Sequence, residues 1–116
     1  MVTILHRPEP NPGESRTIRL EGREVGGPVS LFLVDAAPGQ SSSLHMHPYV
    51  ETWVVRRGEA EFIVAGEAAH ASPGDIIVAP AGAPHRWTNV GNDRLELVCI
   101  HPVSYTHLTL PTICSV

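Results

Sequence analysis

Apolar and polar residues alternate over several short stretches of the chain, and Gly, Pro, Asn or Asp stands between one stretch and the next. Successive side chains of a β-strand point to opposite faces of a sheet, so this alternation is typical of strands with a buried face. No segment longer than one turn has the periodicity of an amphipathic helix. The pattern predicts an all-β protein, with strands over residues 17–20, 29–35, 44–47, 51–56, 60–65, 76–79, 85–88 and 94–101.

Four potential metal ligands fall within these segments. His45 and His47 are two residues apart in a predicted strand, so their imidazoles should point to the same side. Glu51 opens the next strand, which can return antiparallel beside them, and His85 can close the set from another strand. Gly82, in the turn before His85, is expected to take a positive φ. Three imidazole nitrogens and one carboxylate suit one divalent transition metal, and affinity order does not choose among Fe(II), Mn(II), Ni(II), Co(II) and Zn(II).

The spacing around these residues extends the pattern to two longer motifs. They read Gly39-x5-His45-x-His47-x3-Glu51-x6-Gly58 and Gly74-x5-Pro80-x-Gly82-x2-His85-x3-Asn89. Both motifs resemble the two signatures of the cupin superfamily at every defining position, over about residues 29–101. The resemblance implies a small antiparallel β-barrel or double-sheet jelly roll, with His45, His47, Glu51 and His85 as the ligands of a metal in the barrel mouth. Fe(II) or Mn(II) is the metal we expect first.

Strand alternation also indicates which side chains accompany these ligands on the inward face. If Glu51 points inward, so does Trp53, and if His85 does, so does Trp87. His101 shares a side with Cys99 in the last predicted strand, and is either a group behind the site or a histidine hydrogen-bonded at the strand end. The expected lining of a narrow, aromatic pocket is Tyr49, Trp53, Phe62, Trp87, Cys99 and His101.

Composition and charge narrow the range of partners. A chain of 116 residues suits one domain, and its net charge of −4 gives no basic surface for nucleic acid. No apolar run approaches the roughly 20 residues of a membrane helix, and the first residues lack the layout of a signal peptide. We therefore expect a cytoplasmic protein. Its two cysteines, Cys99 and Cys114, cannot define a disulfide framework.

The chain divides into three parts on this interpretation. Residues 1–28 are an N-terminal arm with the first strand, and the proline- and glycine-rich stretch 9–14 is extended or looped. Residues 29–101 form the barrel. Residues 102–116 differ sharply in composition, because 103–116 contain no Arg, Asp, Glu, Gly or Ala. That tail resembles the in-frame translation of a transposase adapter used in sequencing libraries, so we interpret it as non-native.

Several functions are compatible with the ligand set. The first is a metalloenzyme that acts on a small enol or diol, as a dioxygenase with Fe(II) and with Glu51 as the catalytic base. The same site with another metal suits isomerisation or decarboxylation. The second is a module that binds a small ligand without turnover, and the third is a scaffold with a vestigial site.

A homodimer is the assembly we expect. Val98 and Ile100 alternate with the inward residues of the last strand, and Ile63 does so in an earlier one, so apolar side chains remain on outward faces. Small barrels with a second apolar face commonly cover it with a partner. We expect two copies packed sheet on sheet, with the N-terminal segment crossing over.

Overall fold

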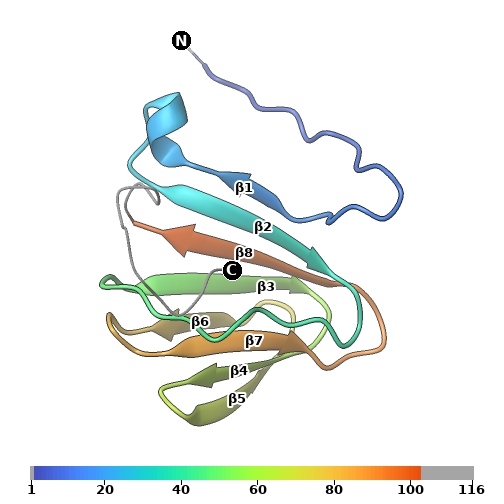
Figure 1. Ribbon diagram of the computed structural model, residues 1–116, viewed down its shortest axis with the longest axis vertical. Coiled ribbons are helices and arrows are strands. Elements are labelled where there is room, and N and C mark those ends of the chain that lie inside the picture. Colours follow the sequence, from blue (N-terminus) through green and yellow to red (C-terminus); the bar gives the residue numbers. More distant parts are fainter. Residues whose placement is uncertain (1, 103–116) are drawn as a thin grey trace.

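The computed structural model describes residues 2–102 of the chain. In this part, eight strands and one short 3-10 helix follow one another (Figure 1). Their bounds are β1 (Ile18–Leu20), η1 (Gly22–Val25), β2 (Ser30–Ala36), β3 (Glu51–Arg57), β4 (Ala60–Val64), β5 (Glu67–Ala71), β6 (Ile76–Ala79), β7 (His85–Asn89) and β8 (Leu95–His101). The prediction of an all-β protein is confirmed.

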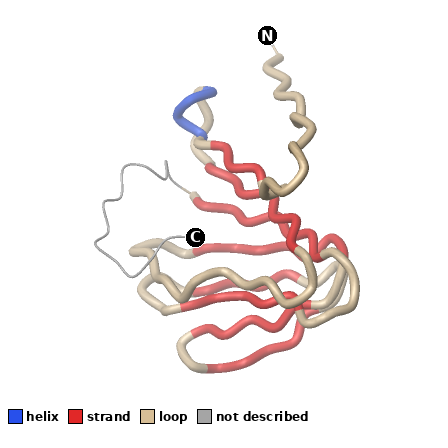
Figure 2. Tube along the Cα trace, turned by 45° about the vertical axis from the view of Figure 1, so that its right-hand side comes forward, coloured by secondary structure: helices blue, strands red, loops and turns tan. Residues whose placement is uncertain are grey.

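The strands form two antiparallel sheets that pack as a jelly-roll sandwich. One sheet has the order β1-β2-β8-β3-β6, and the other has the order β5-β4-β7. Consecutive strands from β5 onward lie in different sheets, so the chain passes back and forth between the two layers. Figure 2 shows two long loops, one before β1 and one that joins β2 to β3. β1 pairs with β2 and is therefore an edge strand of the larger sheet.

The core is filled by the inward face of each strand. In β8, buried and partly buried residues alternate along the whole strand, as the sequence pattern predicts. Burial of such faces supplies most of the driving force for folding, at about 25 cal/mol per Å² of apolar surface. The buried apolar residues are Phe32, Val34, Ala36, Trp53, Val55, Ala60, Phe62, Ala71, Ala79, Trp87, Leu95, Leu97 and Cys99.

The predicted strand over residues 44–47 is wrong. This stretch lies in the loop between β2 and β3, and its ladder contact is one isolated bridge between His45 and His85. The two residues exchange hydrogen bonds, from His45 N to His85 O at 3.1 Å and from His85 N to His45 O at 2.8 Å. Pro48 has no N–H to donate, and this favours a loop after the bridge.

One strand was missed by the sequence pattern. β5 reads Glu-Ala-Ala-His-Ala and has no β-branched or aromatic residue, so nothing in its composition favours a strand. It forms because the turn at Ala65 and Gly66, both with positive φ, folds it back on β4. The bounds of the other predicted strands agree with the structure to within one residue.

Much of the outer face of the five-stranded sheet is apolar, although Thr52 lies in one of its rows and Asp35 and Glu96 are paired on the same face. Two rows of side chains run perpendicular to the strands, because each residue is paired with the next across the ladder. The first row is Ile18, Leu33, Val98, Val54 and Ile76, and the second is Leu20, Leu31, Ile100, Thr52 and Val78. Ile76 and Val78 on the edge strand β6 are exposed, at 66% and 55%.

Membrane-spanning helices and the C-terminal tail were also considered from the sequence. No helix among residues 2–102 is long and apolar enough to cross a membrane. The tail interpretation and Cys114 fall on 103–116, which lie outside the described residues.

Candidate metal centre

The four predicted ligands lie together, although they come from three separate segments. Glu51 is the first residue of β3 and His85 is the first residue of β7, whereas His45 and His47 lie in the loop between β2 and β3. All four side chains are buried, and one ligand atom from each lies within 4.8 Å of the others. These residues form a cluster that could hold a metal ion.

Backbone carbonyl groups fix how two of the imidazoles are turned. His45 Nδ1 lies 2.7 Å from the carbonyl oxygen of Ser43, and His85 Nδ1 lies 3.0 Å from that of Ala83. A carbonyl oxygen only accepts, so each Nδ1 carries the hydrogen and donates it. In a neutral ring the Nε2 is then unprotonated, which leaves its lone pair available for a metal.

Glu51 presents its carboxylate to three histidines. Oε1 lies 3.1 Å from His85 Nε2 and 3.3 Å from His47 Nε2, while Oε2 lies 3.4 Å from His101 Nε2. Burial by itself raises the pKa of Glu51, but the contacts with His47 and His85 outweigh it and hold the pKa at about 2. The carboxylate is therefore ionised at neutral pH, which is the form that binds metal.

The donor set fits a divalent transition metal. If His85 is neutral and donates from Nδ1, its Nε2 lone pair points at the Glu51 carboxylate, and either a proton on Nε2 or a metal cation must lie between the two atoms. His45 Nε2 is buried and has no hydrogen-bond partner among the described residues. A buried nitrogen without a partner costs free energy unless something binds it. A metal held by His45, His47, Glu51 and His85 would satisfy these atoms together.

Tyr49 and His101 form a hydrogen-bonded chain to the other carboxylate oxygen. The Tyr49 hydroxyl lies 2.8 Å from His101 Nδ1, and His101 Nε2 faces Glu51 Oε2. Phe32 packs on the His101 ring with a centroid distance of 5.3 Å, and Tyr49 stacks on His47 at 4.8 Å. Both sequence-predicted residues thus adjoin the cluster. Phe32 was not singled out from the sequence, which placed it only within the predicted strand over residues 29–35.

The remaining predicted pocket residues occupy two different places. Trp53, Phe62 and Cys99 are packed in the core, and the Trp53 ring meets that of His85 edge-on at 5.0 Å. Burial raises the pKa of the Cys99 thiol well above its usual value, so the thiol stays protonated. Trp87 belongs to the same core and also lines a cavity whose lining includes none of the four candidate ligands. Contact of these residues with a substrate stays a prediction.

The comparison with protein families agrees with the two motifs. The family model described as Cupin domain matches residues 32–101, which is more than half of the chain and includes every candidate ligand. The chain belongs to the cupin family. In this cupin, the two signature motifs supply the four clustered side chains from the β2–β3 loop, β3 and β7.

Three relatives share part of the sequence of this cupin. An uncharacterised protein of Streptomyces coelicolor is 30% identical over 80 residues, which are 69% of this chain and 74% of that protein. A dimethylsulfoniopropionate lyase of Ruegeria pomeroyi is 30% identical over 63% of this chain and 39% of its own length. A 5-nitrosalicylic acid 1,2-dioxygenase of a Bradyrhizobium species is 30% identical over 58% of this chain and 32% of its own length. The cupin therefore spans well under half of either enzyme.

A solved structure confirms the jelly-roll sandwich. Oxalate oxidase superposes on this cupin with a TM-score of 0.68 and 27% identity, over 80% of this chain and 53% of that chain.

The metal-free cupin is expected to lose stability as the pH falls from about 6.5 to about 4. Burial lowers the pKa of His101 from 6.5 to about 4, against the opposing charge of Glu51. In this window the unfolded chain binds a proton that the folded chain does not, so stability decreases as the pH decreases. A difference of about 2.5 pKa units corresponds to roughly 3 kcal/mol. Urea denaturation at several pH values between 7 and 4 measures the free energy of unfolding. If a His101→Asn variant lost stability with falling pH as steeply as the unmodified protein does, the loss could not be assigned to His101.

Proposed function

We propose that this cupin is a small metalloenzyme that holds one divalent metal through His45, His47, Glu51 and His85. The observation that carries the proposal is the convergence of these four ligand atoms within 4.8 Å in a buried cluster. Fe(II) or Mn(II) is the metal we propose, while Zn(II), Ni(II) and Co(II) are compatible with the same ligand types.

The protein side chains have separate roles in this proposal. When bound, the metal supplies Lewis-acid chemistry and, as Fe(II), redox chemistry. Glu51 is the catalytic residue that accepts a proton from the substrate, because its carboxylate is ionised and lies inside the cluster. His101 and Tyr49 orient this carboxylate through Oε2. Trp53 packs against His85 and helps to keep bulk water away from the ligand.

The reaction we propose is a dioxygenase-type oxidation of a small enol or diol. The partial match to 5-nitrosalicylic acid 1,2-dioxygenase supports this class. A substrate with two neighbouring oxygens is also suited to a metal with four protein ligands, since an octahedral ion keeps about two positions for other ligands.

Elemental analysis paired with oxygen uptake tests this proposal. The protein is purified without affinity-tag metal, its metal content is measured, and the Fe(II)-reconstituted sample is offered diols, β-diketones and catechols. We expect about one metal ion per chain and substrate-dependent consumption of oxygen. Bound metal without oxygen uptake on any of these substrates would contradict the dioxygenase assignment and leave the metal site standing.

A lyase or isomerase is the second candidate, and the partial match to dimethylsulfoniopropionate lyase favours it. Such a reaction uses the metal only as a Lewis acid and needs Glu51 as the base, as does a decarboxylation. Product formation under strictly anaerobic conditions distinguishes it from the dioxygenase. A binding role without catalysis predicts ligand affinity with no product under either condition.

The apolar rows on the five-stranded sheet support a homodimer packed sheet on sheet. Val98 and Val54 are paired at the centre of one row. Replacing Val98 with lysine is expected to shift the mass measured by light scattering from dimer to monomer, because a charge in a dry interface is costly. The structure places Ile63, which the sequence also marked as outward and apolar, on the other, three-stranded sheet, so Ile63→Lys is the matched control and should leave the mass unchanged. A monomer mass for the unmodified protein at micromolar concentration would contradict the dimer.

A further inference from the structure

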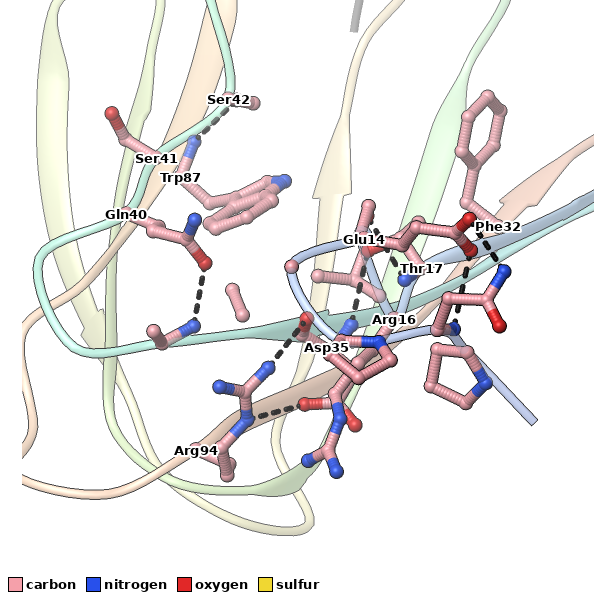
Figure 3. A pocket seen from close by; sticks show the side chains of 18 residues that line it. Glu14, Arg16, Thr17, Phe32, Asp35, Gln40, Ser41, Ser42, Trp87 and Arg94 are labelled. Carbon is pink, nitrogen blue, oxygen red and sulfur yellow. Dashed lines mark hydrogen bonds and ion pairs between the residues drawn. The ribbon is translucent and has the colours of Figure 1, made fainter.

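A cavity of about 800 Å³ lies under the segment that precedes β1 (Figure 3). Residues 10–17 form its outer wall, and β2, the start of the β2–β3 loop and β7 form its inner wall. Small-molecule pockets commonly measure roughly 300–1,000 Å³. Among the described residues that line the cavity, none is a candidate metal ligand, so this is a space distinct from the metal centre.

The inner wall offers an apolar surface that includes an indole ring. Phe32, Val34, Ala36 and Trp87 all line it and are all at most 7% exposed. Figure 3 shows the Trp87 indole extending into the cavity between Gln40 and the arm. An indole face of this kind stacks well on a planar ring. The wall therefore favours an aromatic ligand over a branched or extended one.

Hydrogen-bond donors without a partner accompany this surface. In Figure 3 no hydrogen bond joins the Trp87 indole N–H to the other side chains that line the cavity. Gln40 Oε1 accepts from the Ala37 N–H at 2.6 Å, which leaves the two amide hydrogens of Gln40 available. Ser42 Oγ accepts from the Trp87 backbone N–H at 3.1 Å, so its own hydroxyl hydrogen is available as well. The cavity thus matches a ligand that carries acceptor oxygens.

The charged groups that line the cavity are two acidic and two basic side chains, so their charges sum to zero. Arg94 donates from Nε to Asp35 Oδ1 at 2.7 Å, and the exposed Glu14 accepts from the neutral Asn11 side chain at 2.9 Å. Arg16 is exposed at the rim, where solvent screens its charge. A charged ligand would enter the inner part without a counter-charge, at a high desolvation cost. An uncharged ligand is therefore favoured.

We propose that this cavity binds a flat, uncharged aromatic molecule that carries hydroxyl or carbonyl oxygens, stacked on Trp87. Phe32 lines the cavity and also packs on His101, which faces Glu51, so two side chains, Phe32 and His101, lie between a ligand in this site and the candidate metal cluster. The site uses none of the metal ligands, and it stands whether or not the proposed metal chemistry is correct.

Three naphthalene probes of matched shape test the proposal. Binding of naphthalene-2,3-diol, naphthalene and 2-naphthoate to the full chain is measured by calorimetry. We expect one diol per chain, bound at least about 10-fold more tightly than naphthalene, since two hydrogen bonds are gained. Failure of the diol to bind, or equal binding of the anionic 2-naphthoate, would overturn the proposal.

Variants then locate the diol. Ala36→Leu fills the cavity and is expected to weaken diol binding at least about 10-fold, whereas the same change at exposed Ala69 in β5 should not. Gln40→Met removes two donors from an exposed residue and should weaken binding several-fold without loss of fold. His47→Ala should keep full diol affinity even if it loses metal. Diol binding that is lost in His47→Ala and kept in Ala36→Leu would place the diol on the metal and overturn the proposal.

Discussion

Replacing His47 with alanine is expected to remove the bound metal while the sandwich stays folded. His47 Nε2 lies 3.3 Å from Glu51 Oε1 inside the cluster, so its loss leaves a metal with three protein ligands. Loss of residues that merely orient a ligand commonly costs 10–100-fold in metal affinity, so loss of a direct ligand should cost at least about 100-fold. Metal content after purification without affinity-tag metal, together with circular dichroism, measures both parts of the expectation.

His70→Ala provides the matched control for this experiment. His70 lies on β5, is exposed and pairs with Glu59 at 2.6 Å, so it belongs to a different part of the surface. Its replacement should leave the metal content at about one ion per chain. Full stoichiometric metal in His47→Ala would show that the proposed coordination is incorrect.

Replacing Gly58 with alanine is expected to cost about 3 kcal/mol or more of folding stability. Gly58 lies between β3 and β4 with φ of 86°, a conformation that L-residues avoid at a cost of roughly 1–2 kcal/mol. An added Cβ would also lie 2.5 Å from the carbonyl oxygen of Arg94 and 3.0 Å from Leu95 Cα. These are backbone atoms at the start of β8, so the sheet itself would have to shift, at a further roughly 1–3 kcal/mol.

Gly82→Ala separates the two contributions. Gly82 has φ of 77°, which agrees with the positive angle expected from its sequence position, but no atom lies within 4 Å of an added Cβ. Only the conformational cost applies, and we expect a loss of about 1 kcal/mol, or roughly 4–8 °C in Tm for a domain of this size. Thermal denaturation of both variants makes the comparison, and equal losses would show that the contact with β8 is unimportant.

The sequence contained enough information for the strands and for the identity of the cluster. Alternation along β3 and β8 predicted which residues face inward, because the period of two ties each side chain to one face of a sheet. The spacing of His45, His47, Glu51 and His85 predicted a cluster that the structure brings within 4.8 Å. Both signals are local, since they need only the positions of neighbouring residues.

Features that depend on contacts between segments far apart in the chain could not be predicted from the local sequence pattern. β5 forms because β4 offers it a partner, and the stretch 44–47 stays a loop because His45 alone reaches β7. The carbonyls that turn His45 and His85 belong to loop residues whose identity is immaterial, so the sequence gives no sign of them. The cavity beneath residues 10–17 likewise depends on where the arm crosses β2.

The origin of the candidate ligands has a thermodynamic consequence. Glu51 opens β3 of one sheet and His85 opens β7 of the other, so an ion held by both residues is a cross-link between the two layers. An ion that binds only the folded chain stabilises it by about 2.7 kcal/mol when free ion is 100 times its Kd. The free energy of unfolding would then rise with the concentration of the free ion, so the folded fraction of the protein would depend on the supply of that metal.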